Sequence, residues 1–353
     1  MREKREYLMQ AHDYEFKRVP SGHWFWSRKL DGFRLFWDGG ITRGMPASQV
    51  PWANTEKDYR LKDEVISTGL WTRYGKVFRA PDFWIDRLPT EVQLDGELYL
   101  GRGQWQALSK IVKAFHANEL WEPVQYLVFE KPTLAAFTCD GRVENGTMKK
   151  IFKEVYNHPL VAERIKRQVP AMFESNNIWL QRQTFWNDTV QLHEQIKMPM
   201  RDVDIDRKAM ELSAQEVELG GEGGVLRNGS SVWFPHRSYG LLKIKPYKDA
   251  EGTVVGYVSG VEGKEGRRLG KIGSIIIAWN GILFNLSGLT NQEIDIIPIE
   301  VFQWAMNNPD TKFPDSYSHH LFPLGSKITF KYRELTDDGK PKEARYWRKH
   351  EEM

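Results

Sequence analysis

The chain has 353 residues, of which 41% are hydrophobic and 27% charged, and its formal net charge is +3 at pH 7. This length favours two domains, and this composition excludes a chain that is mainly disordered. The single cysteine, Cys139, excludes an internal disulfide and a multi-cysteine zinc site, and without an apolar run of about 18 residues the sequence predicts a cytoplasmic protein with no membrane span.

The first two thirds of the chain predict a mixed α/β domain. Short, turn-bounded apolar runs favour strands at 23–26, 91–100 and 124–129. Helix-like apolar spacing favours helices at 106–115 and 148–169.

One segment of this domain interrupts the pattern. Residues 44–69 are rich in polar side chains and include Pro46 and Pro51. Such a segment is typical of an insertion or a long loop.

After Pro246 the sequence pattern changes to one typical of short strands with turn signals between them. These strands are expected at 252–259, 274–279, 282–286 and 327–333. Asn280-Gly281 joins two of them and is the strongest short-range signal for a hairpin, because both turn residues must adopt positive φ. Short strands with basic loops suit a small barrel, and the oligonucleotide-binding (OB) fold is one such barrel. We therefore predict domains at 1–246 and 247–353.

Five short motifs carry the chemistry. Taken singly, the first four also have an ordinary structural explanation: a loop, an exposed strand face, core packing and a turn. In chain order they are 29–34 (KLDGFR), 94–100 (LDGELYL), 126–130 (YLVFE), 221–227 (GEGGVLR) and 241–245 (LLKIK).

Strand periodicity predicts which of these side chains act together. In the second motif, Asp95 and Glu97 share one face of a strand and are expected to meet a cleft or solvent. In the fifth, Lys243 and Lys245 share a face, with Leu242 on the opposite one. Two neighbouring ammonium groups repel each other unless an anion lies between them, so a phosphate ligand is expected.

As an ordered set, the motifs resemble those of the covalent nucleotidyltransferases, which are the DNA ligases, RNA ligases and mRNA capping enzymes. Segments 29–37, 72–81 and 94–112 are similar to the small ATP-dependent DNA ligases of bacteria and their phages. The resemblance covers about 23–132 and 220–252, and more weakly the C-terminus.

The resemblance implies an α+β fold in which a nucleotidyltransferase (ATP-grasp-like ligase) domain is followed by a C-terminal OB-fold β-barrel. It also implies an ATP-dependent DNA ligase of DNA repair or replication, which seals 5′-phosphate/3′-hydroxyl nicks through a lysyl-AMP and a DNA-adenylate. The implied partner is nicked duplex DNA. The protein is expected to be a monomer that contains no zinc and lies in the cytoplasm of a bacterial or phage-infected cell.

The resemblance makes Lys29 the nucleophile that takes AMP from ATP. A lysine with a pKa near 10.4 needs activation, which Lys243, Lys245 and a bound Mg²⁺ would supply as nearby positive charge. The residues implied in binding ATP or AMP are Arg34, Glu97, Phe129, Lys243, Lys245 and Arg348. Those implied in binding Mg²⁺ are Glu97 and Glu222.

The same resemblance suggests where DNA is held. It implies that Arg34 and Arg73 bind DNA, whereas Lys264, Arg267, Arg268 and Lys271 are predicted to bind DNA because they lie in a basic loop that interrupts the motif framework. Because only 28 residues precede Lys29, we expect no separate DNA-binding domain. Segment 44–69 and the basic loop 264–271 are expected to supply phosphate contacts instead.

Two positions depart from the family pattern. Glu130 stands where relatives often have Asp, and in the final basic motif only Arg348 can be aligned. An RNA ligase or capping enzyme shares the nucleophile motif and remains an alternative. So does a nucleic-acid-binding module with an inactive transferase site, although every key motif residue is present.

Overall fold

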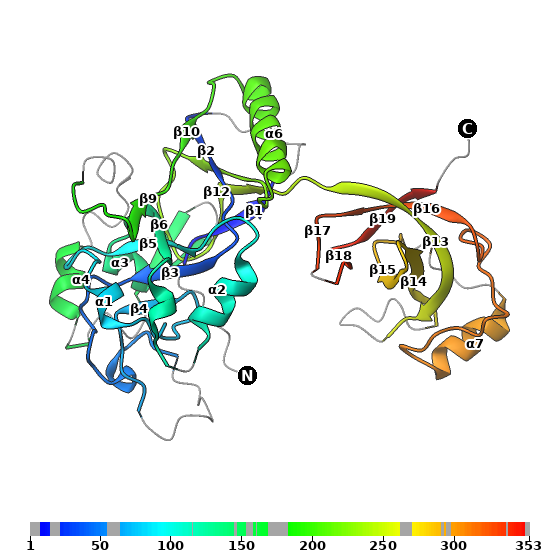
Figure 1. Ribbon diagram of the computed structural model, residues 1–353, viewed down its shortest axis with the longest axis horizontal. Coiled ribbons are helices and arrows are strands. Elements are labelled where there is room, and N and C mark those ends of the chain that lie inside the picture. The colour runs from blue at the N-terminus through cyan, green and yellow to red at the C-terminus, as the bar shows by residue number, and fades with distance from the viewer. Residues whose placement is uncertain are drawn as a thin grey trace. The chain divides into compact units, whose positions relative to one another are not determined.

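A computed structural model describes residues 8–14, 22–54, 64–114, 116–144, 147–152, 158–159, 161–168, 183–261, 270–290, 293, 298–336 and 338–349 (Figure 1). The chain forms two compact units, Met1–Lys245 and Pro246–Met353.

Two five-stranded sheets form the frame of the first unit. The first sheet has the order β1 (Gln10–Asp13), β12 (Arg237–Ile244), β11 (Gly224–Asn228), β2 (Trp24–Arg28) and β10 (Ile196–Lys197). The second has the order β4 (Leu70–Thr72), β3 (Phe33–Trp37), β5 (Leu94–Tyr99), β6 (Gln125–Glu130) and β9 (Val190–Leu192). Strands β2 and β3 belong to different sheets, so the residues between them, 29–32, cross from one sheet to the other.

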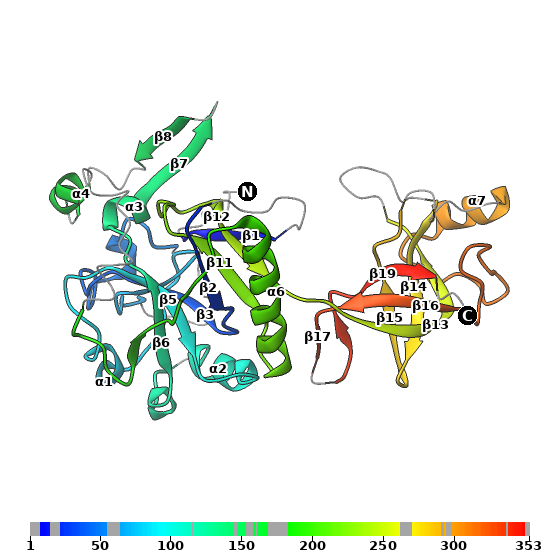
Figure 2. The ribbon, with the colours of Figure 1, turned by 90° about the horizontal axis from the view of Figure 1, so that it is seen from above.

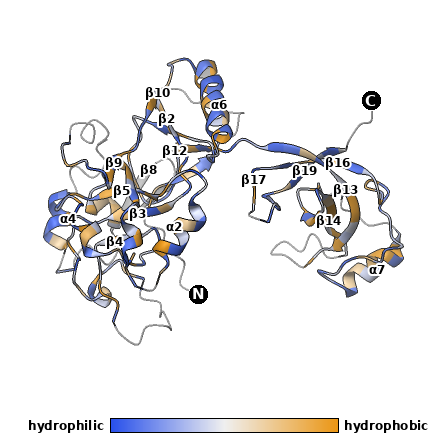
Figure 3. Ribbon diagram, viewed as in Figure 1, coloured by the Kyte–Doolittle hydropathy of each residue, from blue (hydrophilic) through white to orange (hydrophobic). Residues whose placement is uncertain are grey.

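Short helices cover these sheets. They are η1 (Ala47–Gln49), α1 (Asp82–Ile85), α2 (Trp105–Val112), η2 (Glu119–Trp121), α3 (Leu134–Thr138), α4 (Ala162–Gln168) and α6 (Asp202–Glu218). Helix α6 packs Ile205 and Ala209 into an apolar cluster with Trp24 and Trp26 of the first sheet. Along this helix, hydrophilic and hydrophobic residues alternate (Figure 3). A hairpin, β7 (Cys139–Glu144) and β8 (Thr147–Phe152), extends away from the sheets (Figure 2).

Most predicted elements are found, and one is partly wrong. The predicted helix over 148–169 is a strand, β8, at its start and a helix, α4, only at 162–168. The apolar residues Met148, Ile151 and Phe152 have helical spacing, yet pairing with β7 determines their conformation. Such long-range pairing overrides a local pattern.

In its described parts, 44–54 and 64–69, the segment 44–69 is not only a surface loop, because it also contributes buried side chains. Val50 and Trp52 are buried, and Trp52 packs edge-on against Trp71 and Phe137 at 5.9 and 5.7 Å between ring centroids. This packing explains why a polar-rich segment keeps a tryptophan. Residues 55–63 lie outside the described part of the chain.

The second unit is a small β-barrel. Its main strands are β13 (Lys248–Ser259), β14 (Ile272–Trp279), β15 (Ile282–Leu286), β16 (Lys327–Tyr332) and β19 (Arg345–Lys349), in the order β15-β14-β13-β16-β19. A parallel bridge between Ser287 and Arg345 joins the two outer strands, and α7 (Ile299–Asn307) lies between β15 and β16 in the chain. A two-stranded ribbon, β17 (Glu334–Leu335) and β18 (Pro341–Lys342), is attached.

This strand order makes a five-stranded Greek-key barrel, and it confirms the predicted OB fold. The hairpin signal is confirmed as well, since Asn280 and Gly281 have φ of 46° and 76°. Among the described residues, no helix combines the length and the apolar character needed to cross a membrane.

Candidate active site

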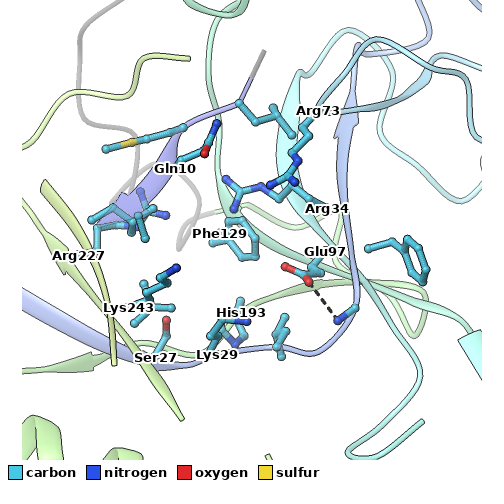
Figure 4. A pocket seen from close by; sticks show the side chains of 18 of the residues that line it. Gln10, Ser27, Lys29, Arg34, Arg73, Glu97, Phe129, His193, Arg227 and Lys243 are labelled. Carbon is cyan, nitrogen blue, oxygen red and sulfur yellow. Dashed lines mark hydrogen bonds between the residues drawn. The ribbon is translucent and has the colours of Figure 1, made fainter. Parts of the chain in front are cut away.

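A cavity of about 610 Å³ opens between the two sheets of the first unit (Figure 4). Its wall includes β1, the 29–32 crossing, β6, β11 and β12. Eight basic residues line it: Arg28, Lys29, Arg34, Arg73, Arg227, Arg237, Lys243 and Lys245. The acidic residue in this wall is Glu97. Such an excess of positive charge in a concave site suits a polyanionic ligand.

Lys29 lies where the chain leaves β2 and crosses between the sheets. Its backbone N–H donates to the carbonyl of Gly223 at 2.8 Å, which ties the crossing to the fourth motif. Its ammonium contacts the Glu222 carboxylate, and Lys245 Nζ lies 3.4 Å from the same Glu222 Oε2. Glu222 therefore connects the predicted nucleophile with one of the two lysines of the fifth motif.

Gly32 brings the crossing against β5. Its N–H donates to Glu97 Oε1 at 3.1 Å, the dashed line in Figure 4. A Cβ on Gly32 would lie 2.1 Å from the carbonyl oxygen of Leu98, so only glycine fits. Burial raises the pKa of Glu97, against the opposing effect of the nearby Lys29 and Arg34. The second motif thus presents one carboxylate at the wall of the cavity.

Asp95, the other acid of that motif, does not face the cleft or solvent as expected. Its side chain is fully buried, because Arg34 and Trp233 cover it. Arg34 Nε and Nη2 donate to Asp95 Oδ1 and Oδ2, each at 2.6 Å, and Trp233 Nε1 donates to Oδ2 at 2.8 Å. Asp95 therefore holds Arg34 in place rather than meeting a ligand.

Phe129 lies beneath this guanidinium, with Arg34 Cζ 4.4 Å from its ring centroid. Leu30, Tyr99 and Leu127 form one small buried cluster with Phe129, and His193 meets its ring edge-on. An aromatic ring exposed at 9% on a cavity wall offers a surface on which a planar base can stack.

Glu130 follows Phe129 and departs from the family pattern. Its Oε2 accepts from Arg227 Nη1 at 2.8 Å, and burial raises its pKa against the effect of Arg227. Glu130 thus fixes Arg227, a cavity-lining cation on β11 that the sequence did not single out.

The fifth motif behaves as strand alternation predicted. Lys243 and Lys245 line the cavity, whereas Leu242 and Ile244 are buried in the opposite cluster. Lys243 Nζ lies 3.4 Å from Asp13 Oδ1, because β1 runs parallel to β12 and places Asp13 opposite Lys243.

The structure brings most of the predicted site residues to one place. Those in the cavity wall are Lys29, Arg34, Arg73, Glu97, Phe129, Lys243 and Lys245. Arg348 and Lys271 belong to the second unit. The predicted DNA-binding residues Lys264, Arg267 and Arg268 lie outside the described part of the chain.

Other cavity residues were missed at the sequence level: Gln10, His193, Arg227 and Arg237. Arg227 is the last residue of the fourth motif, and this position was the one sequence signal that could have predicted any of these four residues. The remaining three come from segments without a motif.

The carboxylates expected to bind Mg²⁺ form no complete metal site by themselves. Within the described residues, no group of three or more His, Cys, Asp and Glu side chains could hold a metal ion. Glu97 and Glu222 are oxygen donors of the kind that Mg²⁺ prefers, but phosphate oxygens and water would have to complete an octahedral shell. The two residues therefore fit Mg²⁺ only as an ion shared with a phosphate ligand.

No family model matches the chain. It is 25% identical over 342 residues to a DNA ligase of Haemophilus influenzae, covering 97% of this chain and 91% of that protein. It is 27% identical over 266 residues to a DNA ligase of African swine fever virus, covering 73% of this chain but 51% of that protein. Among solved structures, one from a structure–function study of Lig E DNA ligases matches with a TM-score of 0.55 and 23% identity, covering 97% of this chain and 98% of the other.

The chain is therefore similar to a DNA ligase over nearly its whole length. The match to the Haemophilus ligase spans both units of this chain. The Lig E likeness independently supports the ligase fold.

Proposed function

We propose that this chain is a DNA ligase that uses ATP to seal nicks in duplex DNA that carry a 5′-phosphate and a 3′-hydroxyl. It does so through a lysyl-AMP on Lys29 and then a DNA-adenylate. The observation that carries the proposal is the place of Lys29, on the wall of a cavity between two sheets and among eight basic residues.

In the first step, Lys29 Nζ attacks the α-phosphorus of ATP. A P–N bond forms, the bond to the bridging oxygen breaks, and pyrophosphate leaves. Lys29 must lose a proton first, and its contact with Glu222 opposes this because it favours the ammonium form. Lys243 and Lys245, on the same wall, stabilise the charge that develops on the phosphate.

The cavity also offers contacts for the rest of the nucleotide. Phe129 provides a face for adenine, while Glu97 and Arg34 lie beside it for the ribose. Glu97 and Glu222 would hold Mg²⁺, which would supply further positive charge for the phosphates.

In the later steps, AMP moves from Lys29 to the 5′-phosphate of the nick, and the 3′-hydroxyl attacks that phosphate as AMP leaves. Arg34 and Arg73 line the cavity and are suited to hold the 5′-phosphate. Segment 44–69 and the loop 264–271, with Lys271, are proposed to hold the duplex, and Arg348 to orient the pyrophosphate. The working form is proposed to be a monomer.

The decisive experiment is self-labelling with α-labelled ATP and Mg²⁺, followed by denaturation. Wild-type protein is expected to retain label, and Lys29→Ala is expected to retain none. Lys110→Ala, a change of an exposed lysine on α2, is the matched control and should label normally. A well-folded, initially AMP-free wild type that takes up no label would refute the proposal.

Substrate choice is tested with the same preparation. Sealing of a DNA nick is compared with sealing of an RNA nick, and ATP with GTP and NAD⁺. Faster sealing of the RNA nick would favour the RNA ligase alternative, and labelling by GTP alone would favour a capping-type transferase.

A further inference from the structure

His193 lines the cavity, and the proposed reaction gives it no role. It directly follows β9, and its backbone N–H donates to the carbonyl of Val128 at 2.8 Å. The imidazole meets Phe129 edge-on, with ring centroids 5.8 Å apart and planes at 67° (Figure 4). His193 therefore lies at the rim of the ring on which a base would stack.

The imidazole is buried without the partners that a buried polar group normally has. The residue is only 4% exposed, and neither Nδ1 nor Nε2 has a hydrogen-bond partner. Leaving such a group unsatisfied costs about 1–3 kcal/mol, and a native structure avoids this unless water or a ligand supplies the partner. Leucine or phenylalanine would fill the same volume without that cost.

The charge state of His193 indicates the kind of ligand group it suits. Burial, together with nearby Arg28 and Arg227, lowers the pKa of His193 to about 3. The ring is therefore neutral at physiological pH, with one N–H donor and one acceptor nitrogen. A neutral donor–acceptor pair suits the edge of a purine base, whereas the cations elsewhere in the cavity suit the phosphates.

We propose that His193 hydrogen-bonds the edge of the purine base that stacks on Phe129, and so positions the nucleotide in the cavity. This rests on the proposed function, because it takes ATP as the ligand. A rotation about χ2, which is a soft torsion in histidine, changes which ring edge meets the cavity without moving the backbone.

Equilibrium binding of α,β-methylene-ATP, which cannot transfer AMP, tests the proposal without requiring any reaction. His193→Phe keeps a ring but loses both nitrogens, and it is expected to weaken binding about tenfold. His193→Asn and His193→Gln place an amide near Nδ1 or Nε2, and one of them should recover most of the affinity. Inorganic tripolyphosphate, which has no base, should bind His193→Phe as well as it binds the wild type.

Self-labelling provides a second readout. In His193→Phe, the ATP concentration for half-maximal labelling should rise about tenfold, while the rate at saturating ATP changes less than about threefold. Unchanged binding of α,β-methylene-ATP would overturn the proposal. So would an equal loss of tripolyphosphate binding, because His193 would then only support the shape of the cavity.

The two proposals fail in different ways. A wild type that does not label overturns the ligase reaction, whereas the binding comparison still decides the role of His193. A wild type that labels, together with a His193→Phe variant that binds normally, overturns only the role of His193.

Discussion

The ion pair between Arg34 and Asp95 should show strong energetic coupling. Arg34→Met removes the counter-ion of a carboxylate that is fully buried. Asp95→Asn removes the counter-charge of a guanidinium whose side chain is 23% exposed. Because each single change leaves one charge without its partner, the double variant should lose less stability than the sum of the two single losses.

The geometry sets the size of these effects. Losing one member of a buried ion pair costs about 3–5 kcal/mol. Trp233 continues to donate to Asp95, so we expect about 3 kcal/mol for Arg34→Met. Arg34 can turn partly toward water, so we expect about 2 kcal/mol for Asp95→Asn. The double variant should lose about 3 kcal/mol rather than about 5, a coupling energy of about 2 kcal/mol.

Urea unfolding of the full chain, followed by tryptophan fluorescence, measures these losses. Eleven of the 14 tryptophans lie within residues 1–245, so the signal reports mainly on the unit that contains the pair. Strict additivity, with the double variant within about 0.5 kcal/mol of the summed single effects, would refute the reasoning.

Other predictions concern the lysines and two buried acids. Lys243→Met and Lys245→Met should each slow self-labelling at least about a hundredfold, since each removes a preorganised cation; labelling within a few-fold of wild type would contradict this. Burial raises the pKa of Asp38 from 3.8 to about 6, so its stabilising contribution is full below about pH 4 and is lost as the pH rises through about 6. Between pH 4 and 7, the free energy of unfolding of Asp38→Asn, measured by urea titration, should therefore vary by up to about 3 kcal/mol less than that of the wild type. An unchanged slope of this free energy against pH would argue against the prediction. Arg227→Met leaves Glu130 buried without its cation, so the loss of stability should grow as the pH rises, and a pH-independent loss would count against that pairing.

Sequence motifs predicted several of the residues that line the cavity. Lys29, Glu97, Phe129 and the lysines of the fifth motif all line it, because period-two alternation fixes which strand residues share a face. The hairpin at Asn280-Gly281 was equally predictable, since its conformation depends on the two turn residues themselves.

What the sequence could not supply is the identity of sheet neighbours. Asp95 is buried because Arg34 and Trp233, far away in the chain, fold over it. The start of the predicted helix 148–169 is a strand because β7 pairs with it. His193 reaches the cavity because β9 runs parallel to β6, a pairing that no local pattern reveals.

The parallel pairing of β1 with β12 also bears on how this enzyme is made. Gln10 and Arg237, which this pairing brings together, are 227 positions apart in the chain. At about 5–20 residues per second, a ribosome needs roughly ten seconds or longer to supply the second strand after the first. Before β12 has been synthesised, Leu8 and Met9 lack some of the residues that bury them in the folded protein. The cavity also lacks the wall that carries Lys243. A nascent chain therefore cannot complete this cavity before almost all of its first unit has been synthesised, and its amino-terminal apolar residues are expected to be a target for chaperones during that interval.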